Sequence, residues 1–311
     1  MTTMTIKSRP YSGEQDYQRV RDLLVESYAI TQKLHNWGLD RWDVFRYAGH
    51  AHDESVNQRP WEADVRLWER DSGQLVGAVH PEDGGDVFLQ IHPHYRHLED
   101  EMLEWAERRH QASRPSEADR WPLHTYIYDY DEERAALLPR RGYENRGHCG
   151  YTRRRSLDGP IPDARLPQGY SVRHIHRENK GDREKLAAVH NAAFNSTRSS
   201  AETVRVLTGA PTYRSDLDLV TVAPDGTFGS FCTIWFDETN RIAVFEPVGT
   251  HPAHQRRGLA KAMMCEGLRR IEALGVATVY VGAGTGAAAN RLYESVGFTD
   301  FDRDYHWQKE F

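Results

Sequence analysis

The chain has 311 residues, 39% of them hydrophobic, and a formal net charge of −6 at pH 7. This length favours two domains, each with enough apolar residues to bury a core. The acidic balance and the lack of a long basic run argue against a nucleic-acid-binding protein.

No stretch approaches the ~18 apolar residues that span a bilayer, and the N-terminus lacks the apolar core of a signal peptide. We therefore expect a cytoplasmic protein without a membrane partner. The three cysteines, Cys149, Cys232 and Cys265, lie far apart without metal-ligand spacing. They fit a reducing compartment, where they would be small buried hydrophobes, and we expect no bound metal.

The first half of the chain shows the apolar patterns of a mixed α/β domain. Tyr17, Val20 and Leu24 share one helix face, and the later runs are strand-like and bounded by turn residues. In chain order we expect a helix around 17–24, strands at 65–68, 75–79 and 87–91, a helix at 98–105, a strand at 124–128 and a short helix ending near Gly142.

The second half repeats this order of elements. We expect a helix around 186–193, strands at 219–222, 230–236 and 244–250, a helix at 264–271, a strand at 278–281 and a short helix ending near Gly297. In both halves a strand runs into a His-Pro step, at Pro93 and at Pro252. A repeat of about 155 residues is too long for a solenoid unit and indicates a duplicated domain.

The proline- and glycine-rich stretch Ser156–Gly169 separates the two copies and is typical of a linker. We therefore predict a first domain at 1–157, a linker at 158–168 and a second domain at 169–311. Gly142 and Gly297 stand where a helix C-terminus favours a left-handed residue.

In the second half, the sequence Gln255-Arg-Arg-Gly-Leu-Ala260 lies between a strand and a helix. Gly258 would let backbone approach backbone closely. The free N–H groups at the helix N-terminus, aided by the helix dipole, would form a cradle for a diphosphate, with Arg256 and Arg257 at its rim. The alternative is a basic loop that binds no ligand.

The surroundings of this loop make the pattern more specific. It follows a strand that ends in Glu246–Thr250, and Asn290-Arg-Leu-Tyr293 and Val296-Gly-Phe298 come later in the chain. Over about residues 240–300 this combination resembles the acyl-CoA motif of the GNAT superfamily of N-acetyltransferases. The resemblance implies an α/β (α+β) protein of two tandem GNAT-like domains, each a mixed, splayed central sheet flanked by helices, and acetyl-CoA as co-substrate.

The resemblance also implies roles for single residues. Val248 and Thr250 would offer strand amides to the pantetheine arm and the thioester carbonyl, and Asn290 would touch the arm. Tyr293 would be the general acid that protonates the departing thiolate. The pyrophosphate would be held by the loop and the lysine beside it: Gln255, Arg256, Arg257, Gly258, Leu259, Ala260 and Lys261.

An amine nucleophile must also lose a proton, at a cost of ~4–5 kcal/mol at neutral pH. We choose Glu246 as the general base because it shares strand parity with Val248. A bulge at Pro247 would weaken this argument. Asp237 and Glu238, on the preceding turn, and a relay through water are the alternatives.

Both catalytic candidates have a purely structural interpretation. Tyr293 lies on an apolar helix stripe with Ala289, Leu292 and Val296, which is typical of a core position. Glu246 could simply form a cap or pair with an arginine.

Two other patterns point to different chemistry. Val279–Ala287 matches the dinucleotide fingerprint G-x-G-x-x-A, but no further βαβ units follow it. Its glycines are better explained by a strand end that passes close to the arm of coenzyme A. His92, His94 and His97 could suggest a metal, but no carboxylate or cysteine partner stands at ligand spacing, which favours a solvated loop.

The first copy lacks the residues of this site. Aligning the His-Pro steps and the glycine caps places three residues opposite site residues: Glu99 opposite Gly258, Glu101 opposite Ala260 and Leu138 opposite Tyr293. A carboxylate ~5 Å from a phosphate costs about 3 kcal/mol at an effective dielectric of ~20, roughly a hundredfold in affinity. We predict a degenerate first copy, kept for structure or substrate recognition, and one working site per chain.

We predict acetyl transfer from acetyl-CoA to a primary amine, most simply that of a small molecule. Acetylation of a protein or peptide amine is an alternative, and an inactive acyl-CoA-binding regulator is an alternative of another class. The acceptor-facing segments 36–49, 198–213 and 237–241 are polar and aromatic but identify no acceptor. We expect a monomer or a homodimer.

Overall fold

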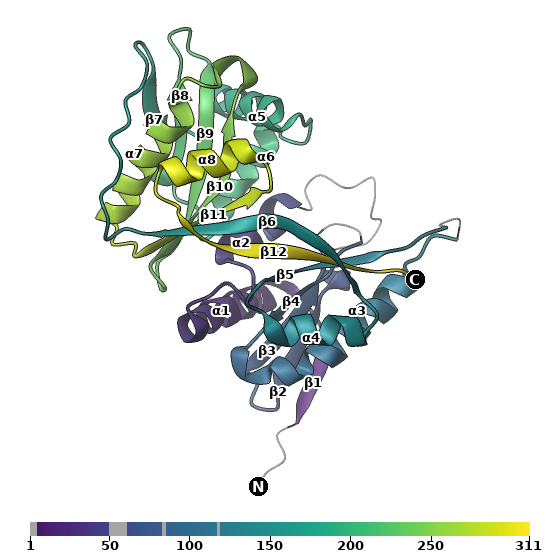
Figure 1. Cartoon of the computed structure of the whole chain (residues 1–311). Coiled ribbons are helices and arrows are strands. Elements are labelled where there is room, and N and C mark those ends of the chain that lie inside the picture. Colours follow the sequence, from purple (N-terminus) through teal and green to yellow (C-terminus); the bar gives the residue numbers. More distant parts are fainter. Residues whose placement is uncertain (1–4, 50–60, 83–84, 117–118) are drawn as a thin grey trace. The chain divides into compact units, whose positions relative to one another are not determined.

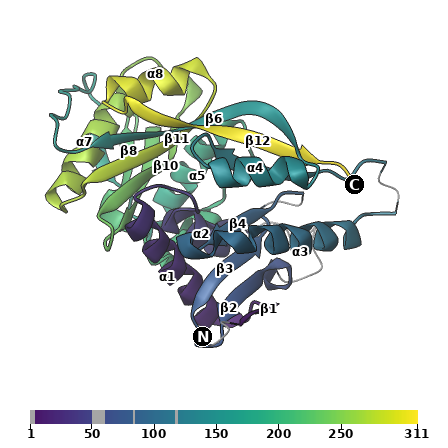
Figure 2. The ribbon, with the colours of Figure 1, turned by 60° about the horizontal axis from the view of Figure 1, so that its bottom comes forward.

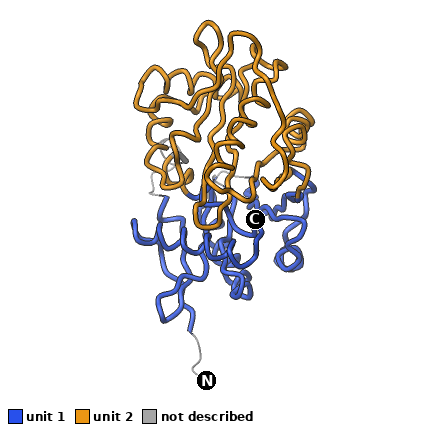
Figure 3. The backbone as a smooth tube through the Cα atoms, turned by 90° about the vertical axis from the view of Figure 1, so that its left-hand side faces the viewer, with its two compact units in different colours: residues 1–42, 53–149, 302–311 blue, residues 43–52, 150–301 orange. Residues whose placement is uncertain are grey.

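The computed structural model describes residues 5–49, 61–82, 85–116 and 119–311. These divide into two compact units, shown in Figure 3. Unit 1 contains Met1–Trp42, Asp53–Cys149 and Asp302–Phe311, and unit 2 contains Asp43–His52 and Gly150–Phe301. Among the described residues, no helix is both long and apolar enough to cross a membrane.

Unit 1 contains an antiparallel sheet in the order β1-β2-β3-β4, followed by a pair of antiparallel strands, β5 and β12. A parallel bridge between Asp86 and His124 links the β4 segment to β5. Helices α1 and α3 contact β3 and β4 (Figure 2). The elements are β1 (Ile6–Pro10), α1 (Gly13–Thr31), α2 (Leu39–Val44), β2 (Arg66–Arg70), β3 (Leu75–His80), β4 (Phe88–Ile91), α3 (Glu99–Ala112), β5 (Leu123–Tyr128), α4 (Glu132–Arg140) and β12 (Asp300–Lys309).

Unit 2 has its strands in the order β11-β10-β9-β8-β7, and only β10 and β11 run parallel (Figure 1). Helix α7 contacts β8, β9 and β10, and α5 contacts β9 and β10. The elements are β7 (Ser171–His174), α5 (Lys180–Phe194), α6 (Ala201–Val206), β8 (Asp218–Val222), β9 (Phe228–Asp237), β10 (Ile242–Thr250), α7 (Leu259–Ala273), β11 (Thr278–Gly284) and α8 (Ala287–Ser295).

The core of unit 2 fixes where α7 begins. Met263, Met264 and Leu268 of α7 are fully buried against the sheet. Gly267 allows the close approach, since a Cβ there would lie 2.5 Å from Ile234 Cδ1 and 3.0 Å from the Phe245 ring. The tight packing holds the N-terminus of α7 beside the end of β10.

The last strand of each sequence half pairs with a strand of the other half. Residues 150–156 of β6 (Glu144–Ser156) pair antiparallel with β11, from Gly284↔Gly150 to Thr278↔Ser156. In unit 1, β12 pairs with β5, from Asp304↔Tyr128 to Lys309↔Leu123. The compact units therefore differ from the predicted bounds 1–157 and 169–311. Strands β6 and β12 each lie at the end of a sequence half. Their positions in the chain therefore do not show which sheet each of them joins.

The predicted α/β architecture with flanking helices is confirmed, and the predicted strands match observed ones to within a few residues. The two glycine caps also have the expected conformation, with φ of 84° at Gly142 and 93° at Gly297. In each copy the next residue closes the helix end, because Tyr143 N donates to Leu138 O and Phe298 N donates to Tyr293 O, both over 3.0 Å. Strands β1, β6, β7 and β12 were not predicted.

Candidate active site

The sheet of unit 2 opens between β10 and β11. The parallel pairing runs from Ile242↔Thr278 to Phe245↔Val281 and stops there, although β10 continues to Thr250 and β11 to Gly284. Two parallel strands that part within a sheet leave backbone groups on both inner edges without a strand partner. This opening is the splay that the sequence predicted.

Val248 and Thr250 lie on the inner edge of that opening. Beyond an irregularity after Phe245, β10 pairs with β9 in the register Val248↔Cys232 to Thr250↔Ser230, and His251 N donates to Gly229 O over 2.9 Å. Alternate residues of an antiparallel strand turn their N–H and C=O groups to opposite sides. The backbone groups of Val248 and Thr250 therefore turn away from β9, toward the opening.

Glycines at and just beyond the facing end of β11 leave open space. A Cβ built at Gly282, Gly284 or Gly286 would meet no atom within 4 Å. The glycines thus leave space beside the β10 edge, as expected for a strand end that passes close to a ligand. The pairing of β11, parallel only to β10 and antiparallel to β6, does not continue into the parallel βαβ sheet of a dinucleotide-binding fold.

The loop between β10 and α7 presents a row of backbone amides. Gln255 N donates to Pro252 O over 3.4 Å, and the next bond of this kind is from Ala262 N to Gly258 O, over 3.0 Å. Within the described part of the chain, the N–H groups of residues 256–261 have no acceptor. Left-handed backbone at Arg256, with φ of 60°, and at Gly258, with φ of 77°, forms a concave turn of the kind that binds anions.

Gly258 was predicted to let two backbone segments approach closely, but the structure shows a different reason for the glycine. A Cβ at this position would meet no atom within 4 Å, so no backbone approaches closely. What the position requires is positive φ at the N-cap of α7, which a side chain disfavours. The free space and the unused amides together fit a bound diphosphate.

The basic side chains of the loop differ in their contacts. Arg257 Nη1 donates to the Tyr170 hydroxyl over 2.9 Å, and that hydroxyl lies 2.9 Å from His254 Nδ1. Arg256 is exposed and Lys261 is half-buried, and neither forms an ion pair with any described residue. Arg256 and Lys261 therefore remain available to an anion, whereas Arg257 also braces the loop against Tyr170.

Tyr293 is a core residue whose hydroxyl is electrostatically coupled to Glu246. Its side chain is 5% exposed and lies in the main hydrophobic cluster of unit 2. Burial, and then the negative charge of Glu246, raise the pKa of Tyr293 to about 12. The hydroxyl donates no hydrogen bond to a described residue, and its high pKa keeps it protonated at neutral pH.

Glu246 is exposed and lies on the irregular stretch of β10 between Phe245 and Val248. Trp235 Nε1 donates to the Glu246 carbonyl oxygen and holds this stretch against β9. Asp237 pairs with Ile242 at the far end of β10, roughly 13 Å away at ~3.3 Å per residue. Its carboxylate accepts from the backbone N–H of the following turn, at Asn240, over 3.1 Å. This geometry favours Glu246 over Asp237 as the base.

Asn290 is almost fully buried at the start of α8. Its Nδ2 donates to the carbonyl oxygens of Gly284 and Gly286, each over 2.8 Å, and its Oδ1 accepts from Arg153 Nε over 2.7 Å. Asn290 thus holds the turn between β11 and α8. A direct contact with the arm of coenzyme A stays a prediction.

Sequence reasoning did not single out Arg153, Trp235 or Tyr170, all of which brace this region. The arginines at 153 and 155 alternate along a strand, which was a possible signal. Their partners on and after α8 are Asn290, the Glu294 carboxylate and two backbone carbonyls, which lie far along the chain, so no local pattern identifies them.

In unit 1, the positions that correspond to the amide loop of unit 2 are occupied by residues of unit 1 itself. The segment after β4 is a 3-10 helix, Pro93–Leu98, that leads directly into α3, so no loop of open amides exists there. Glu99 is 2% exposed and pairs with Arg96, over 2.7 Å, and Arg134, over 3.1 Å. Two guanidinium groups neutralise the Glu99 carboxylate. The prediction that its charge repels a phosphate, and so prevents binding in the first copy, is therefore wrong. The buried network itself occupies the position.

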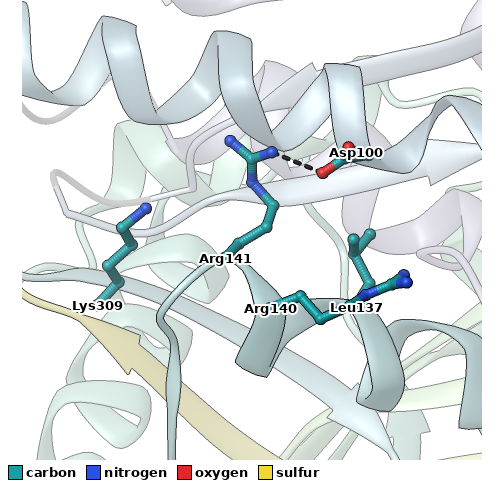
Figure 4. Close-up of a pocket in the computed structure, with 5 residues that line it drawn as sticks. All are labelled: Asp100, Leu137, Arg140, Arg141 and Lys309. Carbon is teal, nitrogen blue, oxygen red and sulfur yellow. Dashed lines mark hydrogen bonds and ion pairs between the residues drawn. The ribbon is translucent and has the colours of Figure 1, made fainter.

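Two further features lie outside the predicted site. A cavity of about 470 Å³ in unit 1 is lined by Asp100, Leu137, Arg140, Arg141 and Lys309, whose side chains are drawn in Figure 4. Its cations are largely used within the chain, since Arg141 pairs with Asp100 over 2.6 Å and Lys309 pairs with Glu107 over 2.9 Å. Over the described ranges, no group of three or more His, Cys, Asp or Glu side chains is arranged to hold a metal ion.

Known proteins are similar to this chain in sequence and in fold. Residues 218–300 match the sequence family described as "Acetyltransferase (GNAT) domain". The mycothiol acetyltransferase of Nocardioides sp. is 28% identical over 268 residues, which cover 78% of this chain and 85% of that protein. The mycothiol acetyltransferase of Salinispora arenicola is 27% identical, covering 76% of this chain and 78% of that one.

Two solved structures share the fold over nearly the whole chain. A tandem GNAT protein from the clavulanic acid biosynthesis pathway superimposes with a TM-score of 0.68 at 17% identity, covering 98% of each chain. A GCN5-related N-acetyltransferase from Sphaerobacter thermophilus gives a TM-score of 0.64 at 20% identity, covering 98% of this chain and 95% of that one. The splayed strands, the amide loop and these matches define an acyl-CoA-dependent N-acetyltransferase. Residues 218–300 match the GNAT acetyltransferase domain, and the fold of the whole chain is that of a tandem GNAT protein.

Proposed function

We propose that the chain transfers an acetyl group from acetyl-CoA to the primary amine of a small molecule, at one site in unit 2. The observation that carries the proposal is the opening between β10 and β11, with the amide row of residues 256–261 at its end. Two relatives are named mycothiol acetyltransferase, so a mycothiol-related amine is the first acceptor to test.

The site contains the groups that binding requires. The amides of residues 256–261, the dipole of α7 and the charges of Arg256 and Lys261 would hold the diphosphate of coenzyme A. The inner edge of β10, at Val248 and Thr250, would hold the pantetheine arm and direct an N–H group at the thioester carbonyl. Such a donor stabilises the oxyanion of a tetrahedral intermediate.

The chemistry then needs two proton transfers. The neutral amine attacks the thioester carbonyl, a C–N bond forms, and the amine proton passes to Glu246 directly or through water. The intermediate collapses, the C–S bond breaks, and the departing thiolate takes the proton of Tyr293. A phenol with a pKa of about 12 is protonated at neutral pH, so it carries the proton that the thiolate takes. The products are the amide and free coenzyme A.

Thiol release from acetyl-CoA across a panel of amines tests this assignment. We expect Tyr293→Phe to lower kcat by about 10²-fold and Glu246→Gln to lower kcat/KM by a similar factor, as for other general acid and base residues. The affinity for acetyl-CoA, measured by calorimetry, should change little in either variant. Tight binding of acetyl-CoA with no thiol release for any amine would instead support an acyl-CoA-binding regulator.

A further inference from the structure

We infer that Arg153 is a positioning residue for the catalytic helix α8, and through it for Tyr293. This inference rests on the proposed function, in which Tyr293 is the general acid. It also gives the first sequence half a role in the site, because β6 is the last strand of that half and contributes residues 150–156 to unit 2.

Arg153 holds α8 at three points. Its Nε donates to Asn290 Oδ1 over 2.7 Å, one terminal nitrogen donates to Glu294 Oε1 over 2.9 Å, and the other donates to Phe298 O over 3.0 Å. The side chain is 4% exposed. The guanidinium also lies 5.2 Å from the centre of the Phe301 ring. A planar fork with five donors makes such a three-way contact, and a lysine ammonium cannot reproduce it.

These contacts fix the orientation of α8. Asn290 and Glu294 lie one turn apart on the same face of the helix, so bonds to both prevent rotation about the helix axis. The bond to Phe298 O, beyond the helix end, fixes its position along the axis. Tyr293 lies between these anchors in the sequence, and its hydroxyl makes no hydrogen bond to a described residue. The direction of its hydroxyl is therefore set by the helix that Arg153 holds.

Arg155 reinforces the same helix end from the next inward-facing position of β6. Its Nη1 donates to Val296 O, and a Cβ on Gly297 would lie 2.6 Å from that nitrogen. Two cations at the C-terminal end of α8 also interact favourably with the helix dipole. The alternation of 153 and 155 places both side chains on the α8 side of the strand.

Arg154 provides the matched control. It stands on the same strand and has the same chemistry, but its Nε pairs with exposed Asp300 over 2.6 Å. It stands between positions 153 and 155, so its side chain turns to the face of the strand opposite theirs. Arg154→Met therefore removes an arginine from β6 without releasing the helix.

A double-mutant cycle separates positioning from general destabilisation. Arg153→Met and Arg154→Met are made in the wild-type chain and in Tyr293→Phe, and kcat, the KM for acetyl-CoA and the thermal midpoint are measured. We expect Arg153→Met to lower kcat about tenfold or more in the wild-type chain and less than about threefold in Tyr293→Phe. Arg154→Met should change kcat less than about twofold in both.

The outcomes distinguish the inference from the function on which it rests. An equal loss of kcat from Arg153→Met in both backgrounds would overturn the positioning role and leave the acid role of Tyr293 intact. An unchanged kcat in Tyr293→Phe would overturn both. If Arg153→Met does not fold, Arg153→Lys and Arg154→Lys take the place of the two methionine variants. We then expect a partial loss of kcat in Arg153→Lys and none in Arg154→Lys. Equal kcat values in these two variants would overturn the inference.

Discussion

Asn36 holds both backbone groups of Ile91: its Nδ2 donates to Ile91 O and its Oδ1 accepts from Ile91 N, each over 2.9 Å. Alignment of the two His-Pro steps places Ile91 opposite Thr250. In both strands, parity turns these backbone groups away from the preceding strand. Unit 1 thus fills with its own side chain the edge that unit 2 leaves open.

We expect one acetyl-CoA site per chain for this reason. In unit 1 the strand edge is occupied by Asn36, the amide loop is a 3-10 helix, and the phosphate position contains the buried Glu99 network. Calorimetric titration should give a stoichiometry near one. The single binding event should weaken in a Gly258 variant and persist in Asn36→Ala. Two equivalent sites would contradict a degenerate first copy.

Replacement of Gly258 by alanine should weaken binding of acetyl-CoA. Both Gly258, with φ of 77°, and Gly73, with φ of 84°, are left-handed, and neither has a neighbour within 4 Å of a built Cβ. Gly258→Ala and Gly73→Ala should therefore each lower the free energy of unfolding by about 1–2 kcal/mol. Only Gly258→Ala should also raise the dissociation constant, by about tenfold, because its Cβ and the strain act at the amide row. Equal affinities in the two variants would argue against a phosphate site there.

Local sequence patterns predicted most of the helices and strands. Periodicity and turn residues located the strands around the opening, and the glycines at 142 and 297 had the predicted left-handed backbone. The parallel pairing of β10 with β11 ends at Phe245, before Val248 and Thr250, to which the resemblance assigned the splayed edge. These features depend on a few consecutive residues, which is the range over which a sequence pattern is informative.

The features that were missed depend on contacts between distant segments. Asn36 reaches Ile91, and Arg153 reaches Asn290, across separations that no local pattern encodes. The charge of Glu99 was predicted to repel a phosphate, but Arg134, far along the chain, neutralises it. A carboxylate seen alone in a sequence carries no information about the cations that pair with it.

Stability should fall as the solution is acidified through the range of the buried carboxylates. Burial would raise the pKa of Glu99 and of Asp131, but nearby arginines, foremost Arg134, hold both below their ordinary values. A carboxylate with a depressed pKa contributes stability above its unfolded pKa of about 4, and the contribution is lost as the pH falls through the folded value.

Thermal midpoints between pH 7 and pH 3 test this sign. The wild-type midpoint should drop below about pH 4.5, and Glu99→Gln should be less stable at pH 7 but less sensitive to acid. Glu104→Gln serves as the control, since Glu104 forms an exposed pair with Arg108 over 3.0 Å and such pairs contribute little. An acid limb that is identical in Glu99→Gln and the wild type would contradict the prediction.

Because β6 of the first sequence half pairs with β11 of the second, we predict that the second half alone does not form a soluble domain that binds acetyl-CoA. A fragment of residues 169–311 lacks β6, so β11 loses its antiparallel neighbour along Thr278–Gly284, and α8 loses the hold of Arg153. An exposed strand edge of that length favours aggregation. We expect this fragment to be insoluble or unable to bind acetyl-CoA, whereas co-expression with residues 1–157 should restore a soluble complex that binds acetyl-CoA. A soluble 169–311 fragment with the affinity of the full chain would show that the strand exchange is dispensable.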